Sequence, residues 1–285
     1  MHVFLAGATG VLGRRIVPGL VAAGHRVTGL TRHDGGGDLL RSLGATPVVA
    51  DAKDRDAMVR AVTAAAPDVV MNQLTDLRTG VGPANSELRL AGSAALAAAV
   101  QAAGVRRVIA QSIAWAYVPG SGLARETEAL DVTAPDPRGR TVRAVATVEE
   151  SAVVAPEWVV LRYGMFYGPD TWYAPDGLRG DEARAGRLVP DSDVTSFVHV
   201  DDAARAAIAA LDWPTGAVNV CDDEPADGLT WIPAFCAAVG AEVPAPGPAR
   251  AAEPWARGAD NTRLRSGLGF ELEHASWRTG FGLPG

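Results

Sequence analysis

The sequence predicts an α/β fold in which a doubly wound parallel sheet is followed by a smaller C-terminal part. The first half of the chain alternates short apolar runs with alanine-rich stretches of helical length. Strands that alternate with helices are typical of right-handed βαβ units, whose parallel sheet is covered on both faces. A glycine-rich turn at residues 7–13 joins the first run to the first helix, and beyond residue 170 the pattern loosens into segments rich in Gly, Pro and Asp.

The strands of the first half are apolar along their length and are bounded by Gly, Asp or Pro. Runs of this kind are typical of strands buried on both faces of a sheet. We expect five of them, at residues 3–6, 26–31, 46–50, 68–74 and 107–111. We expect the helices between them at residues 11–23, 53–66 and 86–103.

The later elements are less regular. They are expected, in order, as a helix, a strand, a helix, a strand and a proline-rich stretch, at residues 141–155, 158–162, 202–211, 217–221 and 244–254. Asp201 immediately precedes the second of these helices, and we predict that its side chain is the N-cap.

The turn Gly-Ala-Thr-Gly-Val-Leu-Gly at residues 7–13 predicts a Rossmann-like dinucleotide-binding fold, because it follows a strand and opens a helix. Gly7 permits the tight turn, Gly10 lets backbone N–H groups approach a pyrophosphate, and Gly13 lets the helix pack closely on the strand. The helix N-terminus stabilises the phosphates through its unpaired N–H groups and its dipole.

Arg32, at the end of the second strand, indicates which dinucleotide binds. Sites that prefer NAD usually place an acidic residue there to bind the ribose 2′-hydroxyl, whereas arginine can clamp a 2′-phosphate with two hydrogen bonds. NADP(H) is therefore favoured over NAD(H), and Arg14 or Arg15 can share the role. Asp51, after the third strand, is placed either to accept from the adenine amino group or to cap the helix at 53–66.

These patterns divide the chain by role. Residues 1–169 are expected to form mainly the NADP-binding domain. Residues 170–285 are expected to form mainly a smaller substrate-binding part, interleaved with the first domain around residues 197–221. Ligands of doubly wound sheets bind at the carboxyl ends of the strands, and the second part would shape a pocket there.

Composition excludes several other classes of protein. The 285 residues include 26 basic and 33 acidic side chains, and the net charge of −7 disfavours a broad nucleic-acid surface. No apolar run reaches the roughly 18 residues of a membrane helix, and the start of the chain lacks the charged segment of a secretory signal. Two cysteines, Cys221 and Cys236, argue against a disulfide framework and a zinc site. We expect a cytoplasmic protein that binds neither nucleic acid nor membrane, and the oligomeric state stays open.

Several segments, spread over nearly the whole chain, carry a specific combination of motifs. Besides the glycines of residues 7–13, they are Arg-Val-Ile-Ala-Gln-Ser at 107–112, Leu-Arg-Tyr-Gly-Met-Phe-Tyr-Gly-Pro at 161–169, Phe-Val-His-Val-Asp-Asp at 197–202 and Arg-Leu-Arg-Ser-Gly-Leu-Gly-Phe at 263–270. Together they resemble the extended short-chain dehydrogenase/reductases of the nucleotide-sugar epimerase type. The resemblance and the strand ends together give the expected cofactor-binding residues: Gly7, Thr9, Gly10, Val11, Leu12, Gly13, Arg32, Asp51, Ala52, Leu74, Thr75, Tyr163, Gly164, Met165 and Phe166.

The chain departs from this family at the catalytic pair. The family places Tyr-x-x-x-Lys on the helix after the serine, where tyrosine moves a proton and lysine lowers its pKa and holds the nicotinamide ribose. The matching positions here are Thr141 and Val145, with Glu149 aligned on the family's helix glutamate. Lys53 is the only lysine, and no tyrosine precedes it by four positions, so no such pair exists. The family's asparagine on the fourth helix is likewise replaced, by Arg89.

The remaining candidates for catalysis are few. The resemblance implies that Ser112 donates a hydrogen bond to a substrate carbonyl, although a serine at the end of a strand can instead bond to backbone. Tyr117 is a candidate acid, but its usual pKa near 10 makes it a poor one without a nearby cation, and the sequence identifies none. His199 is expected to be structural rather than catalytic. We therefore predict that the proton comes from a hydroxyl of the substrate or from ordered water.

The aromatic residues indicate the kind of substrate. All four tyrosines (117, 163, 167 and 173) fall in one window of 57 residues, which also contains Trp158, Phe166 and Trp172 and which Trp115 immediately precedes. Planar aromatic walls suit a flat, polycyclic ligand better than a nucleotide sugar, although some of these side chains, Trp158 above all, are expected in the core. The expected substrate-binding residues are Ser112, Ile113, Trp115, Tyr117, Phe166 and Tyr167.

Two classes of function remain open. The first is an NADPH-dependent ketoreductase that acts on a polycyclic aromatic polyketide, since among relatives without the Tyr/Lys pair the chain is most similar to angucyclinone ketoreductases. The second is a non-catalytic sensor that binds NADP(H). Epimerase or dehydratase activity on a nucleotide sugar is disfavoured, because those reactions depend on the missing tyrosine.

Overall fold

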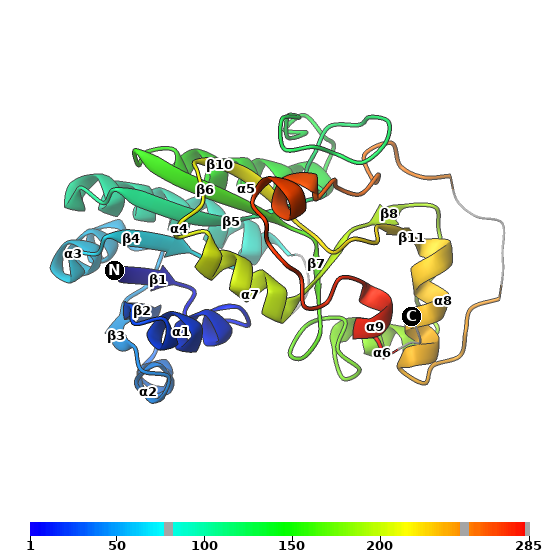
Figure 1. Cartoon of the computed structure of the whole chain (residues 1–285), viewed down its shortest axis with the longest axis horizontal. Coiled ribbons are helices and arrows are strands. Elements are labelled where there is room, and N and C mark those ends of the chain that lie inside the picture. The colour runs from blue at the N-terminus through cyan, green and yellow to red at the C-terminus, as the bar shows by residue number, and fades with distance from the viewer. Residues whose placement is uncertain (77–81, 246–250, 283–285) are drawn as a thin grey trace. The chain divides into compact units, whose positions relative to one another are not determined.

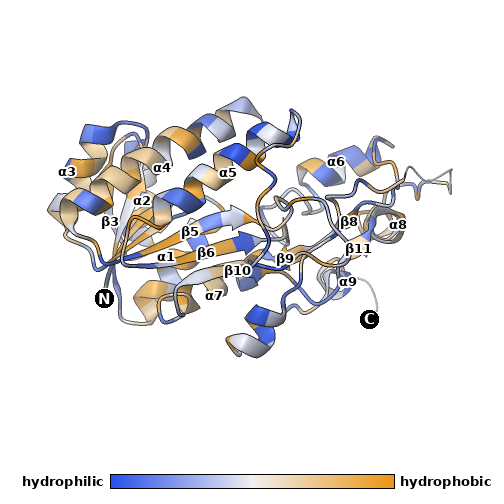
Figure 2. Cartoon of the chain, turned by 90° about the horizontal axis from the view of Figure 1, so that it is seen from above, coloured by the Kyte–Doolittle hydropathy of each residue, from blue (hydrophilic) through white to orange (hydrophobic). Residues whose placement is uncertain are grey.

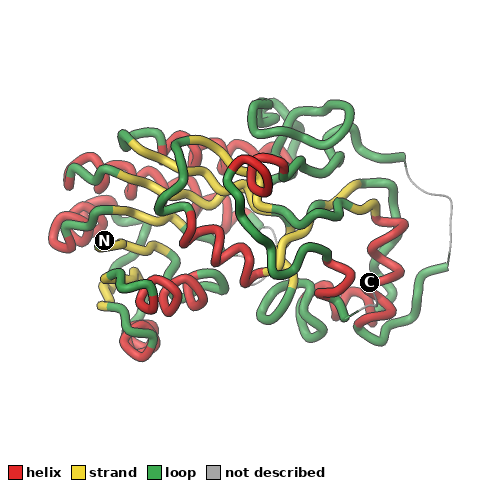
Figure 3. The backbone as a smooth tube through the Cα atoms, viewed as in Figure 1, coloured by secondary structure: helices red, strands yellow, loops and turns green. Residues whose placement is uncertain are grey.

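The computed structural model describes residues 1–76, 82–245 and 251–282. The chain forms two compact units. The first unit consists of Met1–Ser112, Asp131–Leu161 and Ala204–Ala217; the second consists of Ile113–Leu130, Arg162–Ala203 and the chain from Val218 onward. Figure 3 shows that helices and strands make up most of the first unit and that loops make up much of the second. The division of roles near residue 169 stays a prediction.

A seven-stranded parallel sheet forms the centre of the first unit (Figure 1). Its strand order is β10-β6-β5-β4-β1-β2-β3, and β1 pairs in parallel with both β2 and β4. The strands are β1 His2–Ala6, β2 Arg26–Thr31, β3 Thr46–Val49, β4 Val69–Asn72, β5 Arg107–Ile113, β6 Glu157–Tyr163 and β10 Gly216–Val220. All seven predicted strands are present, so the prediction of an α/β fold with a doubly wound sheet is confirmed.

Five of the helices cover the two faces of this sheet. Figure 2 shows α3, α4 and α5 side by side on one face, with α1 and α7 on the other. Gly19 of α1 lies against Ile208 of α7, because a Cβ on this glycine would lie 2.5 Å from the isoleucine Cδ1. The helices are α1 Gly13–Ala22, α3 Arg55–Ala65, α4 Pro83–Ala103, α5 Arg138–Ala152 and α7 Val200–Ala209.

A further helix, α2 (Asp34–Ser42), lies between β2 and β3, where the sequence predicts none. Three consecutive glycines at residues 35–37 conceal it, because glycine disfavours helix interiors. Gly36 is required by packing, since a Cβ there would lie 2.1 Å from Thr31 Oγ1. That hydroxyl donates to the carbonyl of His33 at 3.2 Å and so fixes the entry into α2.

The prediction that Asp201 caps its helix is wrong. α7 begins at Val200, so Asp201 lies inside the first turn. His199 precedes the helix, and its Nδ1 accepts the backbone N–H of Asp201 at 3.3 Å. An imidazole nitrogen thus satisfies one of the N–H groups that a helix start leaves unpaired.

The second unit is built from short elements around an aromatic cluster. Its elements are β7 Met165–Tyr167, α6 Leu178–Arg184, β8 Val194–Thr195, β9 Phe197–His199, β11 Ala226–Asp227, α8 Gly228–Ala238, a π-helical turn at Arg263–Gly267, and α9 Trp277–Gly280. Two small sheets pair β7 with β9 and β11 with β8. The ring centroid of Tyr173 lies 5.2 Å from that of Phe197 and 5.6 Å from that of Trp231. These aromatic contacts give the second unit a core of its own.

The structure also describes the two cysteines, the apolarity of the helices and part of the proline-rich stretch. Cys221 and Cys236 are both buried free thiols. No helix in the described ranges is long and apolar enough to cross a bilayer. The proline-rich stretch at 244–254 lies partly outside the described residues.

Candidate functional site

The turn between β1 and α1 has the geometry of a phosphate-binding turn. Gly7 has a φ of +85°, and a Cβ there would lie 2.3 Å from the carbonyl oxygen of Gln73. A Cβ on Gly13 would lie 2.3 Å from the Gly7 oxygen, so only glycine lets α1 pack this closely on the turn. α1 begins with no side-chain cap and no acidic residue in its first turn, and Gly10 is exposed. The start of the helix can therefore donate N–H groups to a pyrophosphate, and the turn fits a dinucleotide.

Arg32 follows β2, where a dinucleotide places its adenosine ribose. Its side chain is exposed, and no described residue bonds or ion-pairs with it. Arg15 instead donates to the carbonyl of Val11 at 3.0 Å. Asp34 lies in the first turn of α2, two residues beyond Arg32. The free guanidinium supports the prediction that Arg32 binds a 2′-phosphate. Asp34 is the nearest acidic side chain in sequence, and substituting it provides a control for that prediction.

Asp51 does not cap the helix that follows, so that alternative is wrong. Its Oδ1 accepts the backbone N–H of Lys53 at 2.9 Å, and Asp54 is the N-cap of α3, with its Oδ1 3.0 Å from the N–H of Ala57. The adenine contact of Asp51 stays a prediction. Ala52, which was also expected at the cofactor, is 2% exposed and packs in the core of the first unit.

Ser112 lies near the carboxyl end of β5 and donates to the carboxylate of Glu149 on α5 at 2.5 Å. The hydroxyl is completely buried. Its proton is therefore not donated to the backbone, which was the alternative, and the hydrogen bond to a substrate carbonyl stays a prediction. Thr141 and Val145 are buried on the same helix, at the positions where the resembling family has tyrosine and lysine. Glu149, expected from the sequence only to match the family's helix glutamate, is thus the partner of Ser112, and its place on the predicted helix was the available signal.

Tyr117 is buried and unsuited to donate a proton. Its hydroxyl donates to Asn219 Oδ1 at 2.5 Å. The guanidinium of Arg162 lies 4.9 Å from the ring centroid, so the expectation that no cation stands nearby is wrong. Burial still dominates and raises the pKa of Tyr117 well above its usual value, while Arg162 opposes the shift. The phenol of Tyr117 is therefore a poor acid because it is buried, and not because a cation is missing.

The other three tyrosines are no better placed as acids. Burial raises the pKa of Tyr163, of Tyr167 and of Tyr173. Tyr163 donates its hydroxyl to the carbonyl of Ala203 at 3.1 Å, and Tyr167 donates to the carbonyl of Ser276 at 3.3 Å. These four residues are all the tyrosines of the chain. Because the pKa of each is raised, every phenol keeps its proton near neutral pH.

The segment expected to border the nicotinamide lies in the second unit. Phe166 packs edge-on against Tyr163, with ring centroids 5.2 Å apart. Gly164 lies where the backbones of β7 and β9 approach closely, because a Cβ would lie 2.7 Å from the carbonyl oxygen of Ser196. Leu74 and Thr75, from the first unit, are half-buried. The role of these residues at the cofactor stays a prediction.

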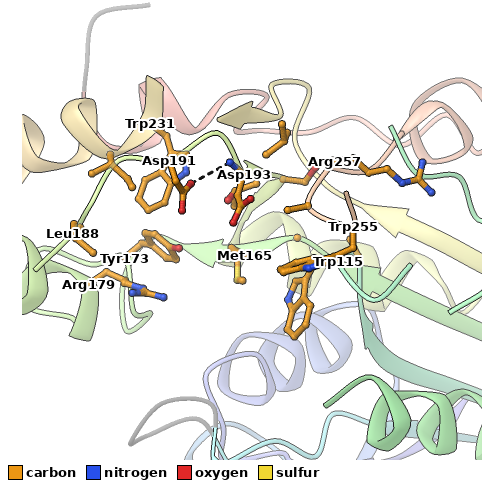
Figure 4. Close-up of a pocket in the computed structure, with 18 of the residues that line it drawn as sticks. Trp115, Met165, Tyr173, Arg179, Leu188, Asp191, Asp193, Trp231, Trp255 and Arg257 are labelled. Carbon is orange, nitrogen blue, oxygen red and sulfur yellow. Dashed lines mark hydrogen bonds between the residues drawn. The ribbon is translucent and has the colours of Figure 1, made fainter. Parts of the chain in front are cut away.

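A pocket of about 370 Å³ lies within the second unit (Figure 4). Trp115 and Trp255 lie at one end, with ring centroids 6.2 Å apart, and Tyr173 lies at the other. Trp231 also lines it, and its Nε1 donor is buried without a bonding partner in the described part of the chain. Met165 completes the apolar wall. The walls suit a planar aromatic ligand that offers a hydrogen-bond acceptor.

The charged side chains of this pocket differ in their availability. Arg179 donates to Glu182 at 2.6 Å, and Arg257 is paired with Glu128. Arg187 is exposed and lines the pocket, and none of the described residues bonds or ion-pairs with its side chain. An acidic group of a ligand would find this guanidinium free.

The predicted substrate-binding set is only partly represented here. Trp115 lines the pocket, whereas Ser112, Ile113, Tyr117, Phe166 and Tyr167 do not. Trp231 and Trp255 line it although they lie outside the aromatic window of the sequence. Trp158 packs against the core of the first unit, as expected.

One cluster in the described residues has the composition of a metal site. Candidate ligand atoms of His199, Asp201 and His274 lie within 4.8 Å of one another. The two imidazole rings have centroids 3.7 Å apart, and His199 Nδ1 already accepts the N–H of Asp201. The arrangement is explained by the capping of α7.

The chain is similar to a known family and to reductases. The model of the NAD dependent epimerase/dehydratase family matches residues 3–221. The 3-diazoavenalumate denitrifying reductase of a Streptomyces species is 44% identical over 307 aligned positions, which cover 99% of both chains. The ceramide reductase of Caulobacter vibrioides is 30% identical over 234 positions, which cover 80% of this chain and 67% of that protein.

Solved structures share the fold. The UDP-glucose 4-epimerase of Thermus thermophilus, in complex with NAD, has a TM-score of 0.77 at 24% identity and covers 99% of this chain. The UDP-Glc/GlcNAc 4-epimerase of Campylobacter jejuni has a TM-score of 0.78 at 18% identity and covers 98% of this chain. The alignments span 97% and 96% of those two chains, respectively.

Proposed function

Since the chain belongs to the NAD dependent epimerase/dehydratase family and is an NAD(P)-dependent oxidoreductase, we propose that it is an NADPH-dependent reductase whose substrate needs no proton from a protein side chain. One observation carries this proposal: every tyrosine is buried with a raised pKa, and the only lysine, Lys53, pairs at the surface with Glu87 at 3.2 Å. A phenol–lysine relay is therefore missing, while the phosphate-binding turn is complete.

The substrate that best meets this requirement is an aromatic diazo acid. The relative that is 44% identical over nearly its whole length is named as a denitrifying reductase of 3-diazoavenalumate, a diazo acid. The bound dinucleotide supplies a hydride. An arenediazonium group that accepts a hydride loses dinitrogen and leaves hydrogen on the ring, so that Ar–N₂⁺ and H⁻ give Ar–H and N₂. This balance includes no proton, and the missing acid is then no defect.

The pocket of the second unit supports this class of substrate. Trp115, Trp231 and Trp255 offer aromatic faces for a planar ring. Arg187 offers a free guanidinium for the carboxylate of an acid. The same pocket also carries the acidic side chains of Asp191 and Asp193.

A second candidate is the reduction of a ketone on a polycyclic, angucyclinone-like aromatic polyketide. Ser112 favours it, because a hydroxyl near the end of β5 is the side chain that the resembling family uses to polarise a carbonyl. Its only proton is donated to Glu149, so it must leave this partner to bind a substrate. The proton would come from a hydroxyl of the substrate or from water.

Isotope labelling separates the two candidates. The purified protein is incubated with NADPH deuterated at the transferred position, and with either an arenediazonium carboxylate or a hydroxylated polycyclic aromatic ketone. We expect dinitrogen release and deuterium on the ring of the first substrate, at a rate above that of an enzyme-free control. Deuterium only in the alcohol of the second substrate would instead establish the ketoreductase. If neither substrate oxidises NADPH, both assignments are wrong.

A further inference from the structure

Arg89 is a buried cation for which the described residues provide no counter-charge. It lies on α4 with 3% of its surface exposed. Its Nε makes no hydrogen bond, and no described residue forms an ion pair with it. Burial alone lowers the pKa of Arg89 to about 10, without any charged neighbour that opposes the shift, and the side chain stays charged near neutral pH.

Two half-buried arginines of the same unit are paired with carboxylates, although their Nε atoms, like that of Arg89, bond to no described residue. Arg138 donates to Asp131 at 2.5 Å, and Arg107 donates to Glu157 at 2.9 Å and to the carbonyl of Ala210 at 3.0 Å. Buried charges in proteins are normally compensated in this way. Arg89 differs from these arginines because no carboxylate of a described residue forms an ion pair with it.

The surroundings of Arg89 are also rich in unused hydrogen-bond donors. Asn85 lies one turn before it on α4, and its Nδ2 is buried without a partner in the described residues. Gln73 follows β4, and both polar atoms of its side-chain amide are buried and unbonded. Buried polar atoms of native proteins are rarely left without partners, and a cluster of them needs a physical explanation.

Contacts along α4 place Arg89 beside this segment. Asn72 Nδ2 donates to Ser93 at 3.0 Å, and the N–H of Asp76 donates to Asn85 Oδ1 at 2.8 Å. Residues 85, 89 and 93 share one helix face, because they are spaced by four. Arg89 therefore faces the chain between residues 72 and 76. The carbonyl of Gln73 touches the phosphate-binding turn, since a Cβ on Gly7 would lie 2.3 Å from it.

We propose that Arg89, with the side-chain amides of Gln73 and Asn85, forms an oxyanion-binding site for the substrate at the carboxyl ends of β1 and β4. The inference rests on the proposed function, because it assigns to this site an anionic oxygen of the substrate. All three side chains present N–H donors, and a guanidinium binds a carboxylate, phenolate or alkoxide oxygen with charge-assisted hydrogen bonds. In the second candidate reaction, a fixed cation also stabilises the negative charge that a hydride brings to the oxygen of a ketone, in a protein without an acid to neutralise it.

The test uses the full-length chain and the variants Arg89→Met, Arg89→Lys and Arg138→Met, with benzoate as the anionic probe and NADP⁺ present. We expect benzoate to raise the melting temperature of the wild type clearly more than that of R89M, with an intermediate response in R89K, because Arg187 remains to bind the same carboxylate in each variant. Without benzoate, R89M should be at least as stable as the wild type, because an unpaired buried charge is removed, whereas R138M should be less stable because it leaves Asp131 unpaired. On a substrate that the wild type reduces, R89M should lower kcat/KM about 10²-fold.

Three results would overturn the assignment. Loss of stability in R89M that matches the loss in R138M, with benzoate protection intact, would make Arg89 structural. Weaker NADP⁺ binding with intact benzoate protection would make it a cofactor residue. A wild type that does not respond to benzoate has no such site. Because benzoate binding is measured without turnover, a failure of the reductase proposal leaves this test decisive.

Discussion

At the scale of single residues, we expect the choice of dinucleotide to depend on Arg32. The side chain is exposed and free at the end of β2. We expect Arg32→Ala to weaken NADPH binding by about 10- to 100-fold, since charge-assisted hydrogen bonds contribute about 1.5–3 kcal/mol. NADH should bind as before, and the two dissociation constants can be measured by fluorescence titration. Asp34→Ala is the matched control, which should leave NADPH affinity undiminished. Equal losses for both cofactors in the Arg32 variant would contradict the assignment.

Ser112 and Glu149 distinguish the two candidate reactions. A ketone gains from a hydroxyl donor, so Ser112→Ala should slow ketone reduction by about 10²- to 10³-fold at most. Diazo reduction should change only a few-fold, because a diazonium nitrogen does not need that donor. Glu149→Gln should release the serine proton, because an amide can donate to the hydroxyl oxygen, and this variant should accelerate only ketone reduction. A loss of diazo reduction in Ser112→Ala as large as that of ketone reduction would sink this distinction.

Asp222 makes stability depend on pH. It is 1% exposed, its Oδ2 is unbonded within the described chain, and burial raises its pKa to about 8, with Glu224 and Asp223 adding to the shift. The folded state therefore holds a proton that the unfolded chain, with a carboxyl pKa of about 3.9, releases. The sign follows: the contribution of this group is complete below about pH 4 and is lost as the pH rises towards about 8.

The Asp222→Asn variant tests this dependence. The amide keeps the oxygen that accepts the N–H of Glu224 at 3.2 Å and cannot ionise. Its melting temperature should exceed that of the wild type at about pH 9, and the difference should shrink towards about pH 5. The measurement is a series of melting curves across this range. A constant difference at all pH values would show that Asp222 does not titrate as described.

At the scale of secondary-structure elements, α1 depends on the absence of a side chain at Gly13. A Cβ there would lie within 2.5 Å of backbone atoms of Gly7 and Ala8, and backbone cannot move aside as a flexible side chain can. We expect Gly13→Ala to shift the start of α1 and to weaken dinucleotide binding at least 10-fold, on the general scale of such backbone effects. Isothermal titration with NADPH measures the loss.

Gly35 of α2 gives the matched control for this prediction. A Cβ there meets no atom within 4 Å. Gly35→Ala should therefore raise the free energy of unfolding by about 0.5–1 kcal/mol, because alanine is the better helix former. NADPH affinity should not change. If Gly13→Ala binds NADPH as tightly as this control does, the close packing is not needed for binding.

The elements also show where sequence patterns succeed. The strands of the sheet are predicted because each is a continuous apolar run between turn residues, and local alternation of strand and helix fixes their parallel arrangement. α2 is missed because its three glycines lower the helix propensity of the segment, and one of them, Gly36, is required by packing against Thr31. β7, β8, β9 and β11 are too short to produce a pattern, and pairing holds them in place.

At the scale of the whole molecule, cofactor binding should increase the free energy of unfolding. A ligand that binds only the folded state at 100 times its dissociation constant adds about 2.7 kcal/mol to the free energy of unfolding. We expect NADPH to raise the melting temperature accordingly, and to slow hydrogen exchange at residues 7–13 and near Arg32. Protection confined to the second unit would contradict the placement of the dinucleotide on the first. NADH at the same concentration is the control, and it should protect less.

Each unit has its own hydrophobic core, and the two cores differ in composition. Aliphatic residues such as Val70 and Leu96 fill the core of the first unit, whereas aromatic residues such as Phe197 and Trp231 fill the core of the second. The aromatic window of the sequence therefore reflects packing as much as ligand binding, since Tyr167 is completely buried among other rings. Periodicity and composition do not distinguish an aromatic side chain in a core from one that lines a pocket.

The sequence alone determined the parallel sheet, the phosphate-binding turn and the absence of a Tyr/Lys pair. These depend on runs of apolar residues, on glycines at fixed spacing and on the count of one residue type, all of which are local or compositional. Only the tertiary structure decided that Ser112 donates to Glu149, that Arg89 is buried without an ion-pair partner among the described residues and that Trp231 and Trp255 line the pocket. Each of these facts depends on contacts, or on missing contacts, between segments far apart in the chain, where burial and hydrogen-bond geometry rather than spacing select the partner.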